Sequence, residues 1–304
     1  MTTTLPIPAT KFIYELVTKD WKEVPTMIRI RNPNKQFESG GMRVCFDVEE
    51  LDEDGTTSDN VAKFFKNDIP DVVDLDYFNE AMAQCMSDEF AQNFNKLPPV
   101  RRKVSFLMCY VVRLDAKYVP EGKPGSFFSY RTQDHDSCMF VMEFKFKGSF
   151  TKYNNNFGEV YEKANPGMSF SQSNRRTEIL DTAEAFSHFT IQESGGSFLV
   201  CDLQGVEDFF TDPQIHTEDG KGLGMGNMGE EGIQKWAGCH KCNNLCRALQ
   251  LRTLSQVRNN VPQAAAQQVL LQQQRPPLLP PPQQGGQEGG NQYKKFQTTM
   301  QAGQ

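Results

Sequence analysis

Residues 186–246 read FSHFTIQESGGSFLVCDLQGVEDFFTDPQIHTEDGKGLGMGNMGEEGIQKWAGCHKCNNLC. Asp202 ends an apolar run, and Asp212 lies in a turn marked by Pro213. Each Asp alone is typical of a turn or a cap. Together, two carboxylates near a strand end can hold a divalent cation through oxygen ligands, and Gln204 adds a neutral oxygen between them. One of the carboxylates can also accept a hydroxyl proton. The trio indicates a site for a metal and a phosphate.

Two further features follow in the same segment. The first is a glycine-rich loop over residues 220–229, which is not a dinucleotide fingerprint because no strand–loop–helix unit at the start of a parallel sheet surrounds it. The second is a cluster of His and Cys. Cys239 and Cys242 have the CxxC spacing of zinc sites, whereas Cys242 and Cys246 would share one face of a helix. We therefore expect a bound metal, and the spacing leaves the ligand set open.

The order of these motifs resembles the alpha-kinases, the atypical Ser/Thr protein kinases that include myosin heavy chain kinase and elongation factor 2 kinase. The resemblance covers roughly residues 29–251, and no single block decides it. The matching blocks, in family order, are AFSHFT (185–190), DLQGV (202–206), TDPQIHT (211–217), GMGNMG (224–229) and HKCNNLC (240–246).

The resemblance implies a two-lobed α+β fold, with an antiparallel sheet and a helix in the N-lobe and a mixed C-lobe that holds a structural zinc. ATP would bind between the lobes and give its γ-phosphoryl group to protein Thr or Ser, with autophosphorylation. Asp202 would orient the substrate hydroxyl and take its proton, while Gln204 and Asp212 would hold Mg²⁺. The implied zinc ligands are His188, His240, Cys242 and Cys246. Cys239 then falls outside the set, and His216 is expected to bond within its own loop. The family associates the glycine-rich loop with peptide substrate, here through Gly224, Gly226, Asn227 and Gly229.

An N-terminal region with nucleotide-binding features precedes these blocks. Glycines between two strands let backbone N–H groups approach a phosphate, although an ordinary hairpin turn has the same composition. By resemblance this phosphate loop is Gly40, Gly41, Met42 and Arg43, with Gly41 where the family more often has Ala. Alternation in Val61-Ala62-Lys63 fits an outward, solvated lysine, but kinases also place their phosphate-pairing lysine in this way. We assign that role to Lys63, with Glu80 and Glu89 as candidate acidic partners.

The apolar run at residues 139–147 has strand character and resembles the hinge between the lobes. There, backbone groups at Glu143 and Lys145 would bond the adenine edge. The alternative for Glu143 is a plain exposed strand residue. Residues 166–180 are polar and we expect them to be irregular. Arg175 and Arg176, which would otherwise be solvated, are by resemblance candidates for a pocket that holds a phosphothreonine.

Periodicity predicts the remaining elements. Residues 1–24 are expected as a lead-in, with a short helix from Lys11 to Lys22, and the kinase domain as residues 25–255 (N-lobe about 25–142, C-lobe about 146–255). The apolar stripe from Asp74 to Leu97 predicts a helix that packs on the N-lobe sheet and stops before Pro98. We also expect a helix over Ile233–Leu249. From residue 256 the chain is rich in Gln, Pro and Gly, which predicts a disordered tail to 304.

Composition narrows the classes of partner. The net charge of −6 gives no reason to expect nucleic acid or an anionic membrane surface. The N-terminus has no signal-peptide pattern, and eight cysteines then favour thiols and metal ligands in a cytoplasmic protein. The expected partner is a protein substrate, and the Pro-rich tail is a candidate ligand for proline-binding modules, with Thr298 and Thr299 as candidate autophosphorylation sites. The alternative function is a zinc-stabilised, catalytically inactive binding module or a Pro-rich adaptor.

Overall fold

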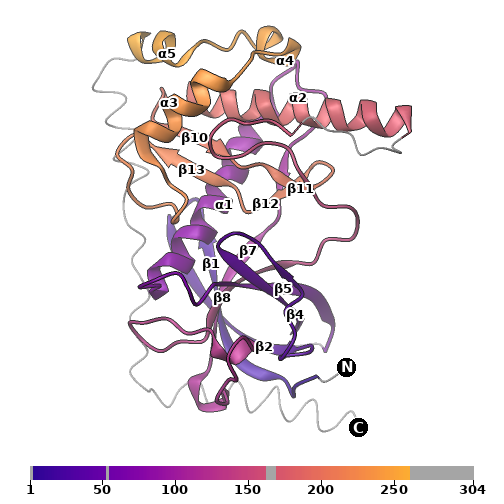
Figure 1. Cartoon of the computed structure of the whole chain (residues 1–304), viewed down its shortest axis with the longest axis vertical. Helices are drawn as coiled ribbons and strands as arrows, with labels where there is room; N and C mark the ends of the chain where they lie inside the picture. The colour runs from indigo at the N-terminus through magenta and orange to yellow at the C-terminus, as the bar shows by residue number, and fades with distance from the viewer. Residues whose placement is uncertain (1–2, 53–54, 162–168, 261–304) are drawn as a thin grey trace. The chain divides into compact units, whose positions relative to one another are not determined.

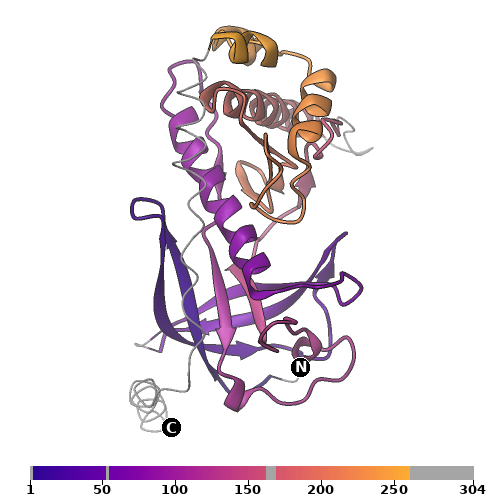
Figure 2. The ribbon, with the colours of Figure 1, turned by 90° about the vertical axis from the view of Figure 1, so that its left-hand side faces the viewer.

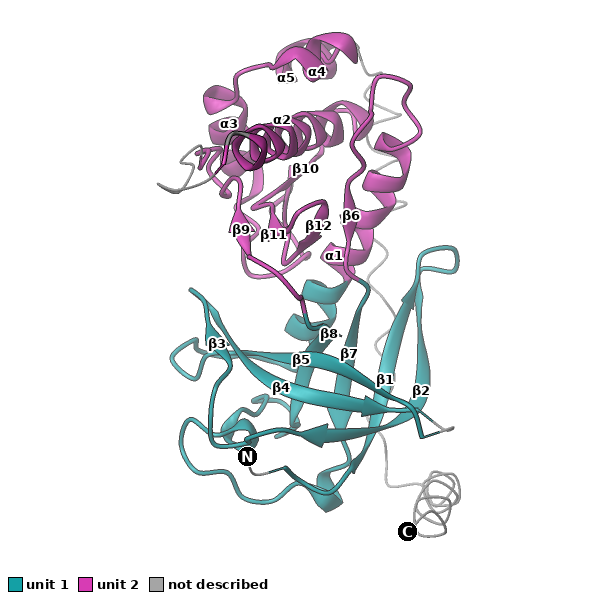
Figure 3. Ribbon diagram, turned by 90° about the vertical axis from the view of Figure 1, so that its right-hand side faces the viewer, with its two compact units in different colours: residues 1–81, 108–145, 277–304 teal, residues 82–107, 146–276 magenta. Residues whose placement is uncertain are grey.

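The computed structural model describes residues 3–52, 55–161 and 169–260. These residues divide into two compact units (Figure 3). Among the described residues, unit 1 contains those from 3 to 81 and from 108 to 145, and unit 2 contains those from 82 to 107 and from 146 to 260. The division after Lys145 falls within residues 139–147, the run that we expected as the hinge. The mixture of strands and helices in Figure 1 confirms the α+β class.

Unit 1 is built on one antiparallel sheet that closes on itself. The strand order is β2-β1-β7-β8-β5-β4-β3, and β2 also pairs with β4 through Met27–Ile30 and Val48–Leu51. Figure 2 shows the strong curvature of these strands. The strands are β1 (Ile7–Glu15), β2 (Asp20–Ile30), β3 (Glu38–Ser39), β4 (Arg43–Leu51), β5 (Thr57–Phe65), β7 (Cys109–Leu114) and β8 (Met139–Phe144), with 3-10 turns at Ala116–Tyr118 and Phe127–Ser129.

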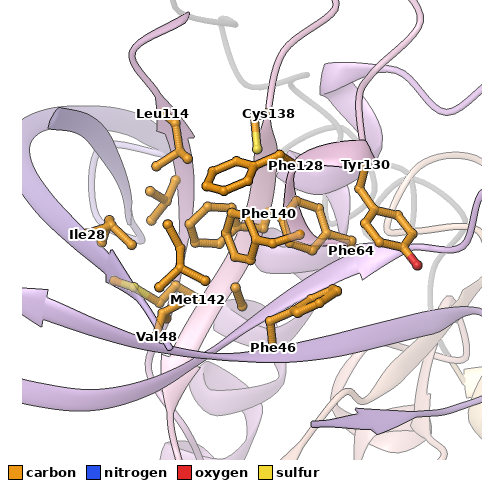
Figure 4. Packing of buried hydrophobic residues seen from close by; sticks show 14 of the residues in the cluster. Ile28, Phe46, Val48, Phe64, Leu114, Phe128, Tyr130, Cys138, Phe140 and Met142 are labelled. Carbon is orange, nitrogen blue, oxygen red and sulfur yellow. The ribbon is translucent and has the colours of Figure 1, made fainter. Parts of the chain in front are cut away.

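Alternating apolar residues point to the inside of this closed sheet. In β4, Val44, Phe46 and Val48 are buried while the residues between them are half-exposed. Phe64 of β5 packs edge-on against Phe127, with ring centroids 4.8 Å apart. Figure 4 shows these aromatic side chains gathered between the strands. Because each aromatic side chain buries on the order of 150–250 Å², this cluster removes a large apolar area of unit 1 from water.

The helix expected from Lys11 to Lys22 is wrong. Residues 7–15 and 20–30 form the β1–β2 hairpin instead, with Lys19 at φ 55° in its turn. β1 also pairs with β7, so the expected lead-in is an integral part of the sheet. The reason is that Phe12 is fully buried by tertiary contacts, including Phe78 at 5.2 Å, and these override the weak helical spacing.

The long helix α1 (Asp74–Phe94) confirms the element expected from its stripe, and it ends before Pro98. Its packing was only partly predicted. Phe78 lies against Phe12 and Trp21 of the sheet in unit 1. Phe94 instead lies against aromatic rings of α2 in unit 2, because the apolar stripe is longer than the sheet needs.

Unit 2 combines two small sheets with four further helices. A four-stranded sheet has the order β6-β12-β11-β9, and β10 pairs with β13 in a separate antiparallel pair. The strands are β6 (Ser105–Phe106), β9 (Thr151–Lys152), β10 (Phe198–Cys201), β11 (Gln204–Val206), β12 (Phe209–Thr211) and β13 (Gln214–Thr217). The helices are α2 (Phe170–Glu193), α3 (Gly229–Cys239), α4 (Asn244–Ala248) and α5 (Leu254–Asn260).

Three helical expectations are corrected in unit 2. Residues 170–180 are not irregular but begin α2, where Ser169 and Gln172 form a capping box; residues 162–168 lie outside the described chain. The single helix expected over Ile233–Leu249 is broken into α3 and α4, because the Asn243 side chain caps α4 by accepting from the Cys246 N–H. Helix α5 runs to Asn260, so the tail expected from residue 256 begins later; residues 261–304, with Thr298 and Thr299, lie outside the description.

Candidate active site and metal centre

In unit 1, Lys63 on β5 forms an ion pair with Glu143 on β8. The register sets Val61 opposite Glu143, so Lys63 and Glu143 are diagonal neighbours on one face. Lys63 is 4% exposed and Glu143 is 2% exposed, which excludes the solvated readings of both residues. Two charges this buried are retained only with a partner. Glu80 of α1 forms an ion pair with Arg43 at 3.0 Å.

The segment expected as a phosphate loop connects β3 and β4. Its backbone closes a turn through the Gly40 N–H, which donates to the Arg43 carbonyl at 2.8 Å. Gly40 and Gly41 are exposed, and a Cβ at Gly41 would meet nothing within 4 Å. Lys145, the residue after β8, has an ion pair with Asp47 and lies over the Phe37 ring. These residues therefore offer an open loop beside a charged strand end.

In unit 2, the three expected oxygen-bearing residues lie together. The Gln204 amide donates to Asp202 Oδ2 at 3.1 Å and to the Asp212 carbonyl at 3.5 Å. Both Asp residues have left-handed backbones, with φ 59° at Asp202 and 51° at Asp212. Such φ values are uncommon outside glycine and cluster at functional sites. Gln84 of α1 holds the second turn, because its Oε1 accepts from the Asp212 N–H at 2.9 Å.

Sequence reasoning missed Lys152 as part of this group. Its Nζ lies 2.6 Å from Asp202 Oδ1, and the β9–β11 register sets Lys152 opposite Gln204. The signal was present, since residues 150–156 lie in the region of resemblance and had no role. Asp202 therefore meets a cation on one oxygen and an amide donor on the other. These two contacts fix the orientation of the carboxylate.

The Asn227 side chain bonds several backbone groups in and beside the glycine-rich loop. Asn227 Oδ1 accepts from the N–H groups of Thr217 and Gly229, both at 3.0 Å. A Cβ at Gly226 would come within 2.5 Å of the Gln214 side chain, so Gln214 would have to move to accommodate one. Gly224 and Gly229 have φ values of 93° and 63°, which also favour glycine.

His216 of β13 anchors the end of the loop. Its Nδ1 accepts from the Met228 N–H at 3.1 Å, and its Nε2 donates to the Asn156 carbonyl at 2.9 Å. Burial lowers the pKa of His216, so the neutral ring is the form that fits this arrangement. His216 was expected to bond within its own loop, but its partners are Met228 of the glycine-rich loop and Asn156 of a distant segment.

The two arginines expected to hold a phosphate lie on α2 with different partners. Arg175 forms an ion pair with Glu207 at 2.5 Å, and Arg176 donates to the Tyr161 carbonyl at 3.0 Å. The Arg176 guanidinium also lies over the Tyr153 ring. A shared anion would therefore have to compete with Glu207 for Arg175.

The structure brings the four expected metal ligands together. One ligand atom from each of His188, His240, Cys242 and Cys246 lies within 4.8 Å of the others. Cys242 Sγ is 3.6 Å from His188 Nδ1, and Cys246 Sγ is 3.6 Å from His240 Nε2. A tetrahedral zinc with bonds of about 2.3 Å to sulfur and 2.0 Å to nitrogen requires an edge of roughly 3.5 Å, so the donor set fits the ion.

The outer nitrogens of both histidines are fixed as metal-binding histidines require. His188 Nε2 donates to the Arg252 carbonyl at 2.8 Å, and His240 Nδ1 donates to Glu184 Oε2 at 3.0 Å. Burial raises the pKa of the Cys246 thiol to about 12 and lowers the pKa of His188. A dication would reverse the cost of the thiolate. Cys239 is exposed and lies outside the group.

Known proteins resemble this chain in sequence and in fold. Residues 38–246 match the profile described as the Alpha-kinase family. Alpha-protein kinase 1 of Dictyostelium discoideum is 34% identical over 238 residues, which cover 77% of this chain and 15% of that protein. Eukaryotic elongation factor 2 kinase of Homo sapiens is 31% identical over 250 residues, covering 80% of this chain and 29% of that protein. The chain thus spans less than a third of each of these relatives.

A solved structure shares the fold. The alpha-kinase domain of myosin-II heavy chain kinase A in complex with AMP-PNP superposes with a TM-score of 0.67 at 25% identity. The match covers 83% of this chain and 98% of that domain. In the described part of this chain, no helix is long and apolar enough to cross a bilayer.

Proposed function

We propose, from the premise that this chain belongs to the alpha-kinase family, that it is an ATP-dependent protein serine/threonine kinase. The observation that carries the proposal is the grouping of Asp202, Gln204 and Asp212, in which both Asp residues have left-handed backbones. Phosphoryl transfer needs mainly positioning and charge neutralisation. An oriented carboxylate, two further oxygen ligands and a buried lysine supply both.

Each residue has a distinct role in the proposed reaction. Asp202 accepts the proton of the substrate hydroxyl as its oxygen attacks the γ-phosphorus, and the bond to the leaving ADP breaks. Gln204 and Asp212 would hold Mg²⁺, which neutralises phosphate charge when bound. Lys63 pairs with the ATP phosphates and Glu143 holds that lysine in place. Lys152 orients Asp202 through their ion pair.

The remaining nucleotide and substrate contacts are part of the same proposal. The turn at Gly40, Gly41, Met42 and Arg43 would cover the phosphates, since its exposed glycines leave the backbone accessible. Backbone groups of Glu143 and Lys145 would meet the adenine edge. Gly224, Gly226, Asn227 and Gly229 would contact the peptide substrate.

The transfer assay tests the proposal directly. Radiolabelled ATP and Mg²⁺ are incubated with a generic basic protein, and wild type is compared with Asp202→Ala. We expect incorporation by the wild type and a loss of roughly 10²-fold or more in the variant, because the positioned base is removed. Asp208→Ala is a control on a nearby carboxylate whose partner is Arg102. Equal background labelling by all three proteins would favour the inactive, zinc-stabilised binding module.

The His/Cys centre would hold a structural zinc, since all four positions of a tetrahedral ion are filled by protein. Metal analysis of Cys242→Ser should show loss of the ion and a lower unfolding temperature. Cys239→Ser is the matched control, because this exposed neighbour lies outside the ligand group. Retention of a full equivalent of zinc by Cys242→Ser would reject the ligand set.

Other parts of the proposal concern partners and location. Arg175 and Arg176 would bind a phosphothreonine, and failure of phosphothreonine peptides to bind or stimulate the wild type would reject this. Proline-binding modules are proposed partners of the tail, which lies outside the described residues. A cytoplasmic location is supported by eight free thiols. The proposal includes no nucleic-acid or membrane partner, given the net charge of −6.

A further inference from the structure

A buried chain of hydrogen bonds leads from the His/Cys centre to the loop that carries Asp202. His240 Nδ1 donates to Glu184 Oε2 at 3.0 Å. The Asn154 amide donates to Glu184 Oε1 at 2.7 Å, and Asn154 Oδ1 accepts from the Leu203 N–H at 2.7 Å. Leu203 is the residue between Asp202 and Gln204. All residues of this series of hydrogen bonds lie in unit 2.

Burial fixes the donor and acceptor of each hydrogen bond in this series. Asn154 is fully buried, Glu184 is 6% exposed and the His240 side chain is 4% exposed. Water cannot readily replace a partner at such positions, so each donor must face an acceptor. Both oxygens of Glu184 and both polar atoms of Asn154 are used, and the order of donors and acceptors is complementary throughout.

Segment 151–154 bonds both backbone groups of Leu203, the residue between Asp202 and Gln204. The Tyr153 N–H donates to the Leu203 carbonyl at 2.9 Å, while Asn154 accepts from the Leu203 N–H. The same segment provides Lys152 to Asp202. A displacement of Asn154 would therefore move the backbone that joins Asp202 to Gln204.

We propose that Glu184 and Asn154 are positioning residues that couple the state of the His/Cys centre to the Asp202–Gln204 loop. The inference rests on the proposed function for the roles of Asp202 and Gln204. Glu184 acts on two groups at once: it orients the His240 ring and it fixes the Asn154 amide. Loss of metal would free His240, and the disturbance would reach Leu203 through only two side chains.

The complementary order allows a swap of chemistry between the two positions. Asn154→Asp sets two carboxylates against each other, and Glu184→Gln sets an amide N–H₂ against the Asn154 amide. Either single change breaks the order. The double variant Glu184→Gln/Asn154→Asp restores it, because the new amide can accept from His240 and donate to the new carboxylate, which still accepts from Leu203. The net charge equals that of the wild type.

The test measures kcat, the KM for ATP, zinc affinity and the unfolding temperature of the four proteins at saturating zinc. Each single variant should lose at least about tenfold in kcat or zinc affinity, as for other residues that orient metal ligands. The double variant should recover most of that loss, a coupling that only interacting residues give. Asn155→Asp is the matched control: its amide donates to Glu159 and its Oδ1 accepts from Phe157 and Glu159, without contact to Leu203.

Hydrogen exchange gives a readout that needs no catalysis. In the wild type, removal of zinc by a chelator should speed exchange in a peptide containing the Leu203 amide more than in a peptide of α1 from unit 2, which reports general unfolding. Both single variants should show the faster exchange with zinc bound. The wild-type experiment tests the coupling even if a variant fails to fold.

Two results would overturn the coupling. One is a double variant no better than the worse single variant, and the other is Leu203 exchange that ignores zinc while α1 stays protected. A wild type that transfers no phosphate would instead reject the proposed function, and the exchange and zinc measurements would still decide whether the two sites are coupled.

Discussion

Each unit of this kinase-family chain holds a lysine paired with a carboxylate, and the two pairs differ in burial. Lys63 and Glu143 in unit 1 have side chains only 5% and 2% exposed. In unit 2, Asp202 is 9% exposed but Lys152 is 39% exposed. The first pair is set by the register of neighbouring strands, whereas the second joins a strand to a loop residue with φ 59°.

The difference in burial predicts that the two ion pairs contribute differently to stability. Removing one member of a buried ion pair leaves an unpaired charge in a low-dielectric site. Removing a half-exposed partner lets water replace it. We therefore expect changes in unit 1 to act on stability and binding together, and changes at Lys152 to act mainly on turnover.

The largest expected effect comes from Lys63→Met. It strands the Glu143 carboxylate and should lower the free energy of unfolding by about 3–5 kcal/mol. Glu143→Leu added to it removes the stranded charge and should restore most of the stability, but not ATP-dependent labelling. Denaturant unfolding and the transfer assay measure the two effects. A single variant as stable as the wild type would remove the distinction between the pairs.

A smaller effect is expected from Lys152→Ala. Stability should fall by less than about 1 kcal/mol, because the lysine is half-exposed. The kcat should fall about tenfold, which corresponds to roughly 1.4 kcal/mol of barrier, while the KM for ATP stays near its original value. Lys235→Ala, an exposed i,i+4 pair with Glu231, is the control. Unchanged turnover in Lys152→Ala would show that this lysine does not contribute to catalysis.

The features that could be predicted from the sequence are those set by neighbouring residues along the chain. Alternation placed Lys63 on its strand, and the apolar stripe placed α1. The four metal ligands came from the family resemblance, and the structure groups them. Other parts depend on distant contacts. The choice of Glu143 as partner of Lys63 follows from sheet register, and Lys152 meets Asp202 through β9–β11 pairing.

Some failures had a readable local signal. Ser169 and Gln172 have the spacing of a capping box, which marks the start of α2 within a stretch judged irregular. Asn243 likewise has the cap position that ends the idea of one helix over residues 233–249. The β1–β2 hairpin had no comparable signal, since Phe12 and Trp21 are buried by distant partners.

The smallest expected effect is a pH dependence at His216. Its pKa is lowered by burial, so below about pH 6.5 the unfolded chain takes up a proton that the folded chain resists. Stability should therefore fall from pH 7.5 to 5.5, by up to about 1 kcal/mol from this residue. His216→Asn should be less stable at pH 7.5 but should lose less on acidification. Parallel thermal curves for both proteins would exclude His216 as the source.

The central claim of the proposed function is that the chain binds magnesium–nucleotide with the help of Lys63 and Asp212. The direct measurement is the affinity of a fluorescent ATP analogue, with and without Mg²⁺, for wild type, Lys63→Met/Glu143→Leu, Asp212→Ala and Asp202→Ala. We predict at least tenfold weaker binding for the Lys63 double variant, loss of the Mg²⁺ dependence in Asp212→Ala, and near wild-type affinity in Asp202→Ala. Wild-type affinity and Mg²⁺ dependence in all three variants would contradict the account.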